Sequence, residues 1–363
     1  MITFLLPTRN RPDALARTLE ALSRIGRAAI VASGGGEVIV VDNDSSLPAR
    51  SPRRLANGLP VHLIRLEENR AAAGRNVGAL AARGEWLMML DDDSWPLDVG
   101  FVSVIANAPA DVAAIGAEIL LPDGSHEAGG LPEVIVGCGA LVRRDAFLAV
   151  GGYDATFGYY AEEYDLCAKF ILAGGRIVHD WRFRVRHEKI QSGRDMNVIL
   201  RHLVRNNAWV MERYAPGSLR ERLVDHTIQR YRRIAEKESA HRGWSRGVTE
   251  LDATLARQVR RPMSARHWDR FTGAAAARAG LASCAGMKAA IIEPGKGAEV
   301  IRDVLGRHDA EIVEIEHAEA FVIGALSPGP MMDAAARLAA RGDRVITAWR
   351  PDMPRAMTPA VIV

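Results

Sequence analysis

Three consecutive carboxylates, Asp91, Asp92 and Asp93, directly follow the apolar run at positions 86–90. Unpaired buried carboxylates are unstable, so the triplet needs a cation, basic partners or water. In an extended segment the first and third side chains point to the same side. Hard divalent ions such as Mg²⁺ and Mn²⁺ bind carboxylates together with phosphate oxygens. The triplet is therefore a candidate metal–diphosphate site, with a solvated acidic turn or a helix N-cap as the alternative.

Two other polar clusters follow runs that have the composition of buried strands. Thr8 and Arg9 come after the apolar run 2–6, and Asp42 comes after the β-branched run 37–41. In open α/β sheets, ligands bind beyond the carboxyl ends of the strands. We therefore expect both clusters and the aspartate triplet to line one crevice.

The elements that must position these residues alternate along the chain. Strand-like runs cover 2–6, 37–41, 62–66 and 85–90, and helical periodicity covers 12–23, 71–83 and 161–173. This alternation predicts an α/β, Rossmann-like fold with a mostly parallel sheet and helices on both faces. We expect three domains: a nucleotide-binding catalytic domain over residues 1–195, a helical extension packed on it over 196–285, and a small α/β domain over 287–363.

Bulk composition narrows the class of protein. The chain has 363 residues, 48% of them hydrophobic and 25% charged, as in folded globular proteins. A net charge of +3 is too small to indicate nucleic-acid binding. Three dispersed cysteines fit a reducing compartment. The first apolar run is too short for a signal peptide, and no run approaches the ~20 residues of a membrane span, so we expect a cytoplasmic protein without a transmembrane segment.

Several short motifs fall in one order along residues 1–210. They read PTRNRP, VVDNDS, NRAAAGRNVGA, MLDDDSWP, GCGALVRRDAF, GGYDATF, YYAEEYDLCAKFILAGGRIV and VRHEKIQSGR, followed by Arg205-Asn206. Together they resemble the family 2 glycosyltransferases, which have the GT-A fold. The resemblance implies an inverting, divalent-metal-dependent transfer of one sugar, a hexose or deoxyhexose, from a nucleoside diphosphate sugar to an acceptor hydroxyl.

The resemblance assigns roles in donor binding. Pro7, Thr8, Arg9 and Asp42 would hold the nucleoside. Arg75 would pair with the diphosphate or the base, because a guanidinium fork matches phosphate oxygens. A turn-forming role for Asp42 and a helix-surface position for Arg75 are the alternatives.

The same resemblance implies different roles for the three aspartates. Asp91 would contact the ribose or the donor sugar, Asp92 would belong to the donor site without a defined role, and Gly137 would let the backbone approach the donor. Asp93 and His187 would bind the metal, Mn²⁺ or Mg²⁺. A neutral imidazole suits Mn²⁺ better than Mg²⁺.

The catalytic base is expected in the acidic pair of AEEYDL. Inverting transfer needs a carboxylate that takes the proton of the acceptor hydroxyl, and Glu163 is the residue that we expect to do so. Related sequences usually carry Glu-Asp here, so Glu162 and Asp165 are alternatives. A purely structural role at a helix N-terminus is also open.

Other functions and partners follow from what remains. A non-catalytic nucleotide-binding scaffold on a degenerate domain would explain the altered acidic pair, and a nucleotidyltransferase would also use aspartates and Mg²⁺. The expected partners are the sugar donor and a hydroxyl-bearing acceptor, which could be a small molecule, a glycan or a lipid-linked sugar, with no nucleic acid. A homodimer is compatible with the C-terminal tract.

The arginines of 176–270 fit either an anionic acceptor or a solvated helix face. Cys138 has no histidine near it in sequence and is expected to be a small buried residue.

Overall fold

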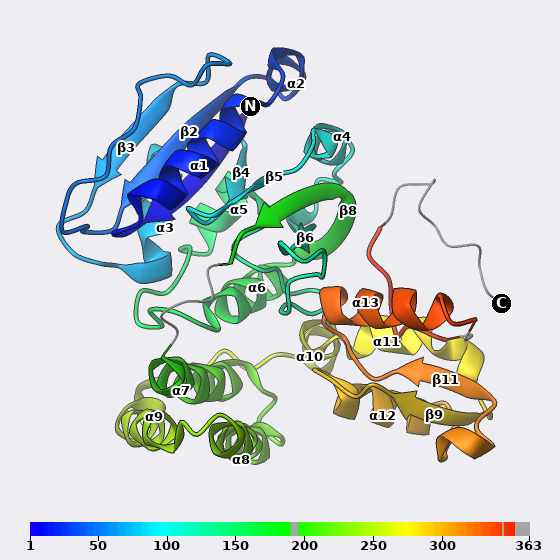
Figure 1. Ribbon diagram of the computed structural model, residues 1–363. Helices are drawn as coiled ribbons and strands as arrows, with labels where there is room; N and C mark the ends of the chain where they lie inside the picture. The colour runs from blue at the N-terminus through cyan, green and yellow to red at the C-terminus, as the bar shows by residue number, and fades with distance from the viewer. Residues whose placement is uncertain (190–194, 343–344, 353–363) are drawn as a thin grey trace.

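A computed structural model describes residues 1–189, 195–342 and 345–352 of the chain (Figure 1). An eight-stranded sheet forms the N-terminal part and a three-stranded sheet forms the C-terminal part. Between them in sequence lies a run of helices, three of which form a bundle below the large sheet in this view. The expected α/β fold, helical region and small C-terminal sheet are thus confirmed.

The large sheet has the strand order β3-β2-β1-β4-β7-β6-β8-β5. Its strands are β1 (Ile2–Thr8), β2 (Gly36–Asp42), β3 (Val61–Arg65), β4 (Trp86–Met89), β5 (Ser94–Pro96), β6 (Val112–Leu120), β7 (Ala140–Arg143) and β8 (Arg176–His187). Strands β3, β2, β1 and β4 are parallel neighbours, as are β6 and β8. Strand β7 runs antiparallel to β4 and β6, and β5 runs antiparallel to β8. The parallel half therefore brings the ends of β1, β2 and β4 to one edge.

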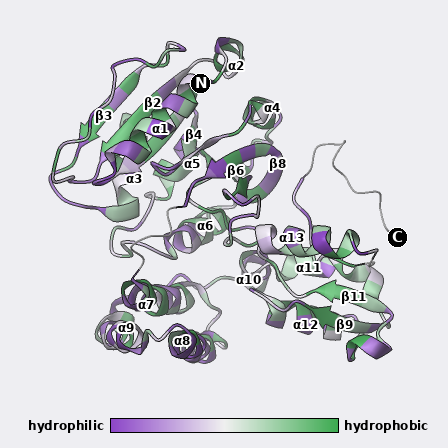
Figure 2. Ribbon diagram, viewed as in Figure 1, coloured by the Kyte–Doolittle hydropathy of each residue, from purple (hydrophilic) through white to green (hydrophobic). Residues whose placement is uncertain are grey.

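Helices cover both faces of this sheet because its central strands are buried on both sides. They are α1 (Pro12–Ser23), α2 (Arg27–Ala32), α3 (Gly74–Ala81), α4 (Gly100–Ala106), α5 (Arg144–Ala149) and α6 (Glu162–Leu172), with the short 3-10 helix η1 (Ala71–Ala73) before α3. On β1, Phe4 and Leu6 pack with α1 and α4, whereas Leu5 packs with α3, α5 and α6. Strand β2 is accordingly mostly hydrophobic, whereas β3 and β8 also carry hydrophilic residues (Figure 2).

The helical region docks on α6. It contains α7 (Met196–Tyr214), α8 (Arg220–Lys237), α9 (His241–Thr254), α10 (Ala265–Thr272) and α11 (Ala274–Gly280), with the 3-10 helices η2 (Leu255–Arg257) and η3 (Ala282–Cys284). At the end of α7, the Arg213 guanidinium and the Tyr214 hydroxyl both donate to Oδ1 of Asp165 in α6, at 2.9 and 2.7 Å. Within the described residues, none of these helices is long and apolar enough to cross a membrane.

The C-terminal part is a small parallel sheet with one helix after each of two strands. Its elements are β9 (Lys288–Ile292), α12 (Ala298–Arg307), β10 (Glu311–Ile312), η4 (Ile315–His317), β11 (Ala320–Ile323) and α13 (Pro328–Ala339), with strand order β10-β9-β11. It contacts the large domain through Ser327, whose hydroxyl accepts a hydrogen bond from the amide of Gly129 at 3.0 Å. The boundaries of the three expected domains stay a prediction.

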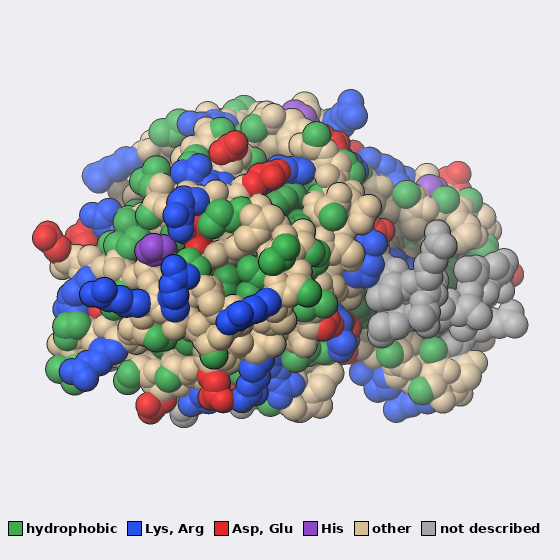
Figure 3. All heavy atoms as spheres, turned by 90° about the horizontal axis from the view of Figure 1, so that it is seen from above, with side chains coloured by type: hydrophobic (Ala, Val, Ile, Leu, Met, Phe, Trp, Pro, Cys, Tyr) green, Lys and Arg blue, Asp and Glu red, His purple; other side chains and the backbone are tan. Residues whose placement is uncertain are grey.

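The surface seen from above carries basic side chains that are spread among hydrophobic and uncharged ones (Figure 3). This pattern agrees with the small net charge of +3. A large basic stripe is the footprint expected for nucleic-acid binding.

Candidate functional site

The ends of three parallel strands define the site. Thr8 of β1 lies beside Asp42 of β2 in the sheet register, and Leu5 of β1 lies beside Met89 of β4. Parallel pairing therefore places the loops after β1, β2 and β4 at the same edge, and the loop after β4 carries Asp91, Asp92 and Asp93. This is where ligands bind in open α/β sheets.

Asp42 is buried and held within its own loop. Its carboxylate accepts hydrogen bonds from the amides of Ser45 and Ala49, both at 2.9 Å, and from the Arg65 guanidinium at 3.2 Å. Burial opposes the charge, but these donors keep the pKa of Asp42 below its ordinary value. The turn-forming interactions expected as the alternative are therefore present, and nucleoside binding by Asp42 stays a prediction.

The residues after β1 differ in exposure. Pro7 is half-buried and Arg9 is exposed, whereas Thr8 is buried and its hydroxyl donates to Oδ2 of Asp92 at 2.7 Å. Thr8 thus holds a member of the aspartate triplet. Contacts from Pro7, Thr8 and Arg9 to a nucleoside stay predictions.

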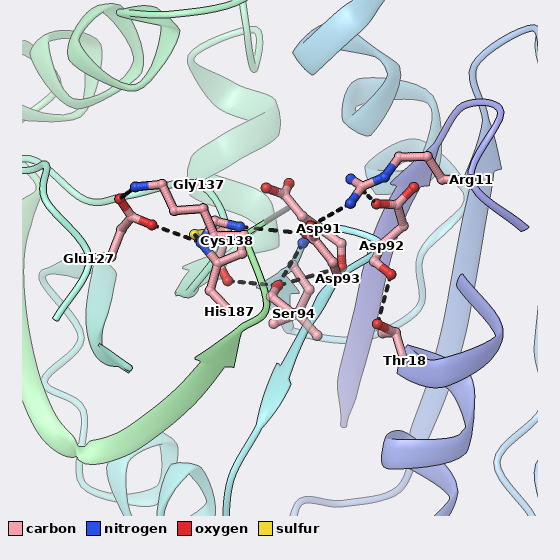
Figure 4. A network of polar contacts seen from close by, with 12 residues as sticks. Arg11, Thr18, Asp91, Asp92, Asp93, Ser94, Glu127, Gly137, Cys138 and His187 are labelled. Atoms are coloured by element: carbon pink, nitrogen blue, oxygen red, sulfur yellow. Dashed lines mark hydrogen bonds and ion pairs between the residues drawn. The ribbon is translucent and has the colours of Figure 1, made fainter. Parts of the chain in front are cut away.

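Arg11 is a functional residue that the sequence reasoning missed. Its guanidinium, just before α1, bridges Asp92 (Nη1 to Oδ1, 2.6 Å) and Asp93 (Nη2 to Oδ2, 2.5 Å), as Figure 4 shows. Burial raises the pKa of Asp92 to about 6 in spite of this partner. For Asp93, hydrogen bonds from His187 and Arg11 outweigh burial and lower the pKa to about 2. The available signal was the basic PTRNRP loop, combined with the pairing of β1 and β4.

Arg75 lies buried beneath Asp91. It is only 6% exposed, and its Nη2 donates to Oδ1 of Asp91 and to the carbonyl of Leu90, the latter at 2.9 Å. The helix-surface alternative is therefore wrong for Arg75. Within the described part of the chain its Nε has no hydrogen-bond partner. The Asp91 side chain, by contrast, is 38% exposed.

His187, at the end of β8, is fixed by three neighbours. Its Nδ1 lies 2.9 Å from Oε2 of Glu127 and 3.5 Å from Sγ of Cys138, and its Nε2 lies 3.5 Å from Oδ1 of Asp93. Burial works against the imidazolium, but Asp93, Cys138 and Glu127 raise the pKa of His187 to about 12. Cys138 is buried as expected, and burial raises its pKa to about 11, so it is a neutral thiol.

These side chains fit a divalent ion. Oδ1 of Asp93 and Nε2 of His187 are 3.5 Å apart, close to the roughly 3 Å between two adjacent ligands of an octahedral ion with bonds of about 2.1 Å. Asp91, Cys138 and His187 also bring one ligand atom each within 4.8 Å of one another. The Glu127 contact to Nδ1 would leave Nε2 for the metal, as in carboxylate–histidine–metal arrangements. Metal binding by Asp93 and His187 stays a prediction.

The three acidic candidates for the base differ in their surroundings. Asp165 accepts from Arg213 and Tyr214 and lies 2.9 Å from Nζ of Lys169, so it is committed to structural contacts. Glu162 is buried, and burial together with the charge of Glu163 raises its pKa well above the ordinary value. Glu163 is half-buried at the start of α6, where burial also raises its pKa.

Gly137 connects Glu163 to the aspartate triplet. Its amide donates to Oε1 of Glu163 at 3.2 Å, and its carbonyl lies 3.5 Å from Nη2 of Arg75, which pairs with Asp91. A Cβ at this position would lie 2.9 Å from Oε1 of Glu163, so a larger residue would displace the end of that side chain. One residue therefore separates the acidic candidate base from the arginine of the candidate donor site.

Comparison with known proteins relates the N-terminal part of the chain to a family. Residues 3–117 match the family described as glycosyl transferase family 2. This part of the chain belongs to glycosyl transferase family 2. An uncharacterized glycosyltransferase of Haemophilus influenzae is 26% identical over 199 residues, which are 47% of this chain and 62% of the relative. The succinoglycan biosynthesis protein ExoO of Rhizobium meliloti is 37% identical over 97 residues, 25% of each chain. The chain thus spans less than two thirds of these curated relatives.

Solved structures share parts of the architecture at low identity. The mannosyltransferase PcManGT from Pyrobaculum calidifontis, in complex with GDP-Man and Mn²⁺, is 18% identical with a TM-score of 0.48 over 76% of this chain and 79% of that one. Residues 1–349 of S. aureus TarS, in complex with UDP-GlcNAc, are 13% identical with a TM-score of 0.49 over 85% and 92% of the two chains.

The loop before α6 has an uncommon backbone conformation. Tyr160 and Ala161 have φ angles of 71° and 66°, in the left-handed region that non-glycine residues rarely adopt. The buried side-chain amide of Asn206 in α7 contacts the carbonyls of Tyr159 and Tyr160 at 2.9 and 2.7 Å. The Arg205-Asn206 motif therefore holds the loop that sets the start of α6 and, with it, Glu163.

A cavity of about 710 Å³ opens beside Glu162 and Glu163. Glu162 and Glu163 line one side, and helices α7, α8 and α10 together with residues 295–300 line the others. The cavity thus joins all three parts of the chain next to the candidate base.

Proposed function

We propose that this chain is an inverting glycosyltransferase that transfers one sugar from a nucleoside diphosphate sugar to an acceptor hydroxyl. The observation that carries the proposal is the position of Gly137, which contacts the candidate base Glu163 with its amide and faces Arg75 of the donor side with its carbonyl. The family 2 membership of residues 3–117 supports sugar transfer as the reaction.

The donor would bind at the edge formed by β1, β2 and β4. Pro7, Thr8, Arg9 and Asp42 would contact the nucleoside, and Arg75 would contribute positive charge beside Asp91. Nucleoside diphosphate sugars are supported as donors by PcManGT, described with GDP-Man, and by TarS, described with UDP-GlcNAc. A hexose or deoxyhexose is the donor sugar that we propose.

Asp93 and His187 would hold a divalent ion, Mn²⁺ or Mg²⁺, with Asp91 close by. When bound, the ion would neutralise charge on the departing diphosphate. Arg11 would keep Asp92 and Asp93 at a fixed position, since its guanidinium contacts both carboxylates. Glu127 would orient the imidazole through Nδ1.

Glu163 would act as the general base. The acceptor hydroxyl would give its proton to a Glu163 carboxylate oxygen while its oxygen forms a bond to the anomeric carbon of the donor. The bond from that carbon to the diphosphate oxygen would break, and the electron pair would leave with the diphosphate. Attack from the side opposite the leaving group inverts the anomeric configuration. The raised pKa of Glu163 makes it a stronger base than an exposed glutamate.

The cavity beside Glu163 would receive the acceptor, a hydroxyl-bearing small molecule, glycan or lipid-linked sugar. The C-terminal part, residues 287–363, would form a third domain that contributes to this cavity. A cytoplasmic location and a homodimer are the setting that we propose for the enzyme.

A thermal-shift panel of UDP, GDP, dTDP and CDP, each with and without Mn²⁺, tests the proposal, because selective binding stabilises the fold by mass action. We expect one nucleotide to raise Tm only with metal, and Asp93→Ala to abolish that shift. The matching nucleotide sugar should then release free nucleoside diphosphate. Binding without turnover for every donor would favour the scaffold function, and pyrophosphate release would favour a nucleotidyltransferase.

A further inference from the structure

The cavity beside Glu163 brings cations of two distant segments together. Lys296, in the loop before α12, and Arg230 and Arg233, in α8, all line it. Nζ of Lys296 lies 4.8 Å above the ring centroid of Tyr164, the residue that follows Glu163. The C-terminal part of the chain thereby reaches the first turn of α6.

These cations lack the carboxylate partners that other basic residues of the helical region have. Arg201 and Arg220, for example, pair with Glu250 and Glu212. Across residues 1–189, 195–342 and 345–352, no carboxylate forms an ion pair with Lys296, Arg230 or Arg233. The acid closest in sequence to Lys296 on the cavity wall, Glu299, pairs instead with His226 at 3.2 Å. These three cations therefore have no ion-pair partner among the described residues, although Glu162 and Glu163 line the same cavity. Lys296 is half-buried, and Arg230 and Arg233 are exposed.

Burial makes the charge of Lys296 costly in the free protein. Desolvation lowers the pKa of Lys296 to about 8, because its ammonium has lost water without gaining an ion-pair partner. An anion in the cavity would supply that partner.

The backbone of the same loop adds to the positive potential. Gly297 has a φ of 91° and begins the ten-residue helix α12 without a side-chain cap. The first residues of α12, Ala298 and Val300 among them, line the cavity. Helix N-termini favour negative charge, and Glu299 in the first turn of α12 supplies part of it.

Aromatic side chains complete the walls. Tyr164, Tyr231, Trp268 and Phe271 line the cavity alongside the cations. Aromatic walls with a few placed polar groups are typical of small-molecule sites, and they suit the apolar faces of a sugar ring. The cavity thus offers an apolar surface, an anion-binding wall and a carboxylate.

We propose that this cavity is the acceptor site and that it selects a sugar or polyol that carries a phosphate group. Lys296, Arg230 and Arg233 bind the phosphate, and Glu163 faces the hydroxyl that receives the sugar. This assignment rests on the proposed transferase function. It gives the C-terminal part of the chain a role, because that part supplies Lys296.

The test measures the binding of phosphates by the full chain in the absence of divalent metal, so that the candidate metal site cannot hold them. The probes are glucose 1-phosphate, glucose 6-phosphate, mannose 6-phosphate and glycerol 3-phosphate. Each is compared with its uncharged counterpart, and binding is measured by calorimetry and thermal shift. We expect the phosphates to bind at least tenfold more tightly than the uncharged compounds.

Variants locate the site. Lys296→Met should weaken phosphate binding tenfold or more, and Lys296→Arg should retain most of it. Lys288→Met, on an exposed position of β9, is the matched control and should bind as the wild type does. The double variant Arg230→Met/Arg233→Met provides the same test on a different element if Lys296→Met does not fold.

The proposal is overturned if no phosphate binds more tightly than its uncharged counterpart, or if neither the Lys296 nor the arginine variants weaken binding. Asp93→Ala should keep phosphate binding while it loses nucleotide binding. If no nucleotide raises Tm but phosphates still bind in a Lys296-dependent way, the transferase function is rejected and the anion site is retained. Sedimentation with vesicles distinguishes a lipid-borne phosphate from a soluble one. A lipid-borne phosphate requires Lys296-dependent binding to phosphatidic acid vesicles and not to phosphatidylcholine vesicles.

Discussion

The amide of Gly137 donates a hydrogen bond to Oε1 of Glu163 at 3.2 Å, and a methyl group on that glycine would lie 2.9 Å from the same oxygen. The backbone of the loop before β7 therefore positions the carboxylate directly. The family resemblance implies an aspartate where this chain has Glu163. The hydrogen bond shows how the longer side chain is held in a defined position.

Replacement of the carboxylate tests its role. Glu163→Gln keeps the size of the side chain but cannot take a proton, so we expect kcat to fall by about 10²–10⁴-fold. Metal-dependent nucleotide binding should be unchanged. Asp145→Asn, in the exposed first turn of α5, is the control and should leave kcat as it is. Full activity in Glu163→Gln would remove Glu163 as the base.

The pH profile should reflect the raised pKa of Glu163. Burial is the main cause of the shift above 4.5. Only the deprotonated form accepts a proton, so kcat/KM should rise with pH through this pKa. The acidic decline should begin at a higher pH than for an exposed glutamate. A decline centred at or below 4.5, measured at saturating Mn²⁺, would be incompatible with this residue as the base.

Metal affinity should depend on His187 and on the residue that orients it. Removal of a residue that orients a metal ligand typically costs about 10–100-fold in affinity, so we expect such a loss for Glu127→Gln and at least as large a loss for His187→Ala. Both are measured as Mn²⁺ binding by calorimetry in the presence of the nucleotide. His62→Ala, with a half-exposed side chain on β3, should bind Mn²⁺ normally. Equal affinity in all three variants would place the metal elsewhere.

Arg11 should contribute to stability through the two aspartates. Arg11→Met leaves Asp92 and Asp93 buried without their guanidinium, and because Arg11 is 36% exposed we expect a loss of about 1–3 kcal/mol in the free energy of unfolding. Arg17→Met, on an exposed position of α1, is the control. The folded-state pKa of Asp93 is about 2, against an ordinary 3.8. Its contribution is therefore present above about pH 4 and is lost as the pH falls toward 2. A loss independent of pH over that range would contradict the ion-pair explanation.

Asn206 should matter for both stability and catalysis. Asn206→Ala leaves the carbonyls of Tyr159 and Tyr160 without their amide partner, which we expect to cost about 1–3 kcal/mol. The loop before α6 would relax, and kcat should fall by about tenfold with little change in nucleotide binding. Asn107→Ala, an exposed amide at the end of α4, should alter neither. An unchanged Tm in Asn206→Ala would show that the loop does not depend on this side chain.

Local sequence was sufficient for the fold and for part of the candidate site. Buried strands and amphipathic helices have distinct periodicities, so their alternation predicted the α/β sheet. The aspartate triplet was evident because charge follows an apolar run without a break. Burial of Cys138 was also expected correctly, since small apolar residues surround it.

Contacts between distant segments were not available from periodicity. The pairing of Arg11 with Asp92 and Asp93 depends on β1 and β4 being neighbours. The absence of a histidine near Cys138 in sequence was misleading, because β8 returns His187 to 3.5 Å from its sulfur. Glu127 lies in a loop without a regular pattern, and Lys296 reaches α6 only through the packing of the C-terminal part.

The loop around Glu127 has a further consequence for how the protein can be altered. His126 and Gly129 are anchored to Asp333 and Ser327 of the C-terminal part, and Glu127 between them contacts His187. A chimera that takes its last eighty or so residues from a homologue would therefore lose the anchors of that loop. Module exchange aimed at new acceptors needs to carry residues 126–129 together with the C-terminal part, because hydrogen bonds join the two.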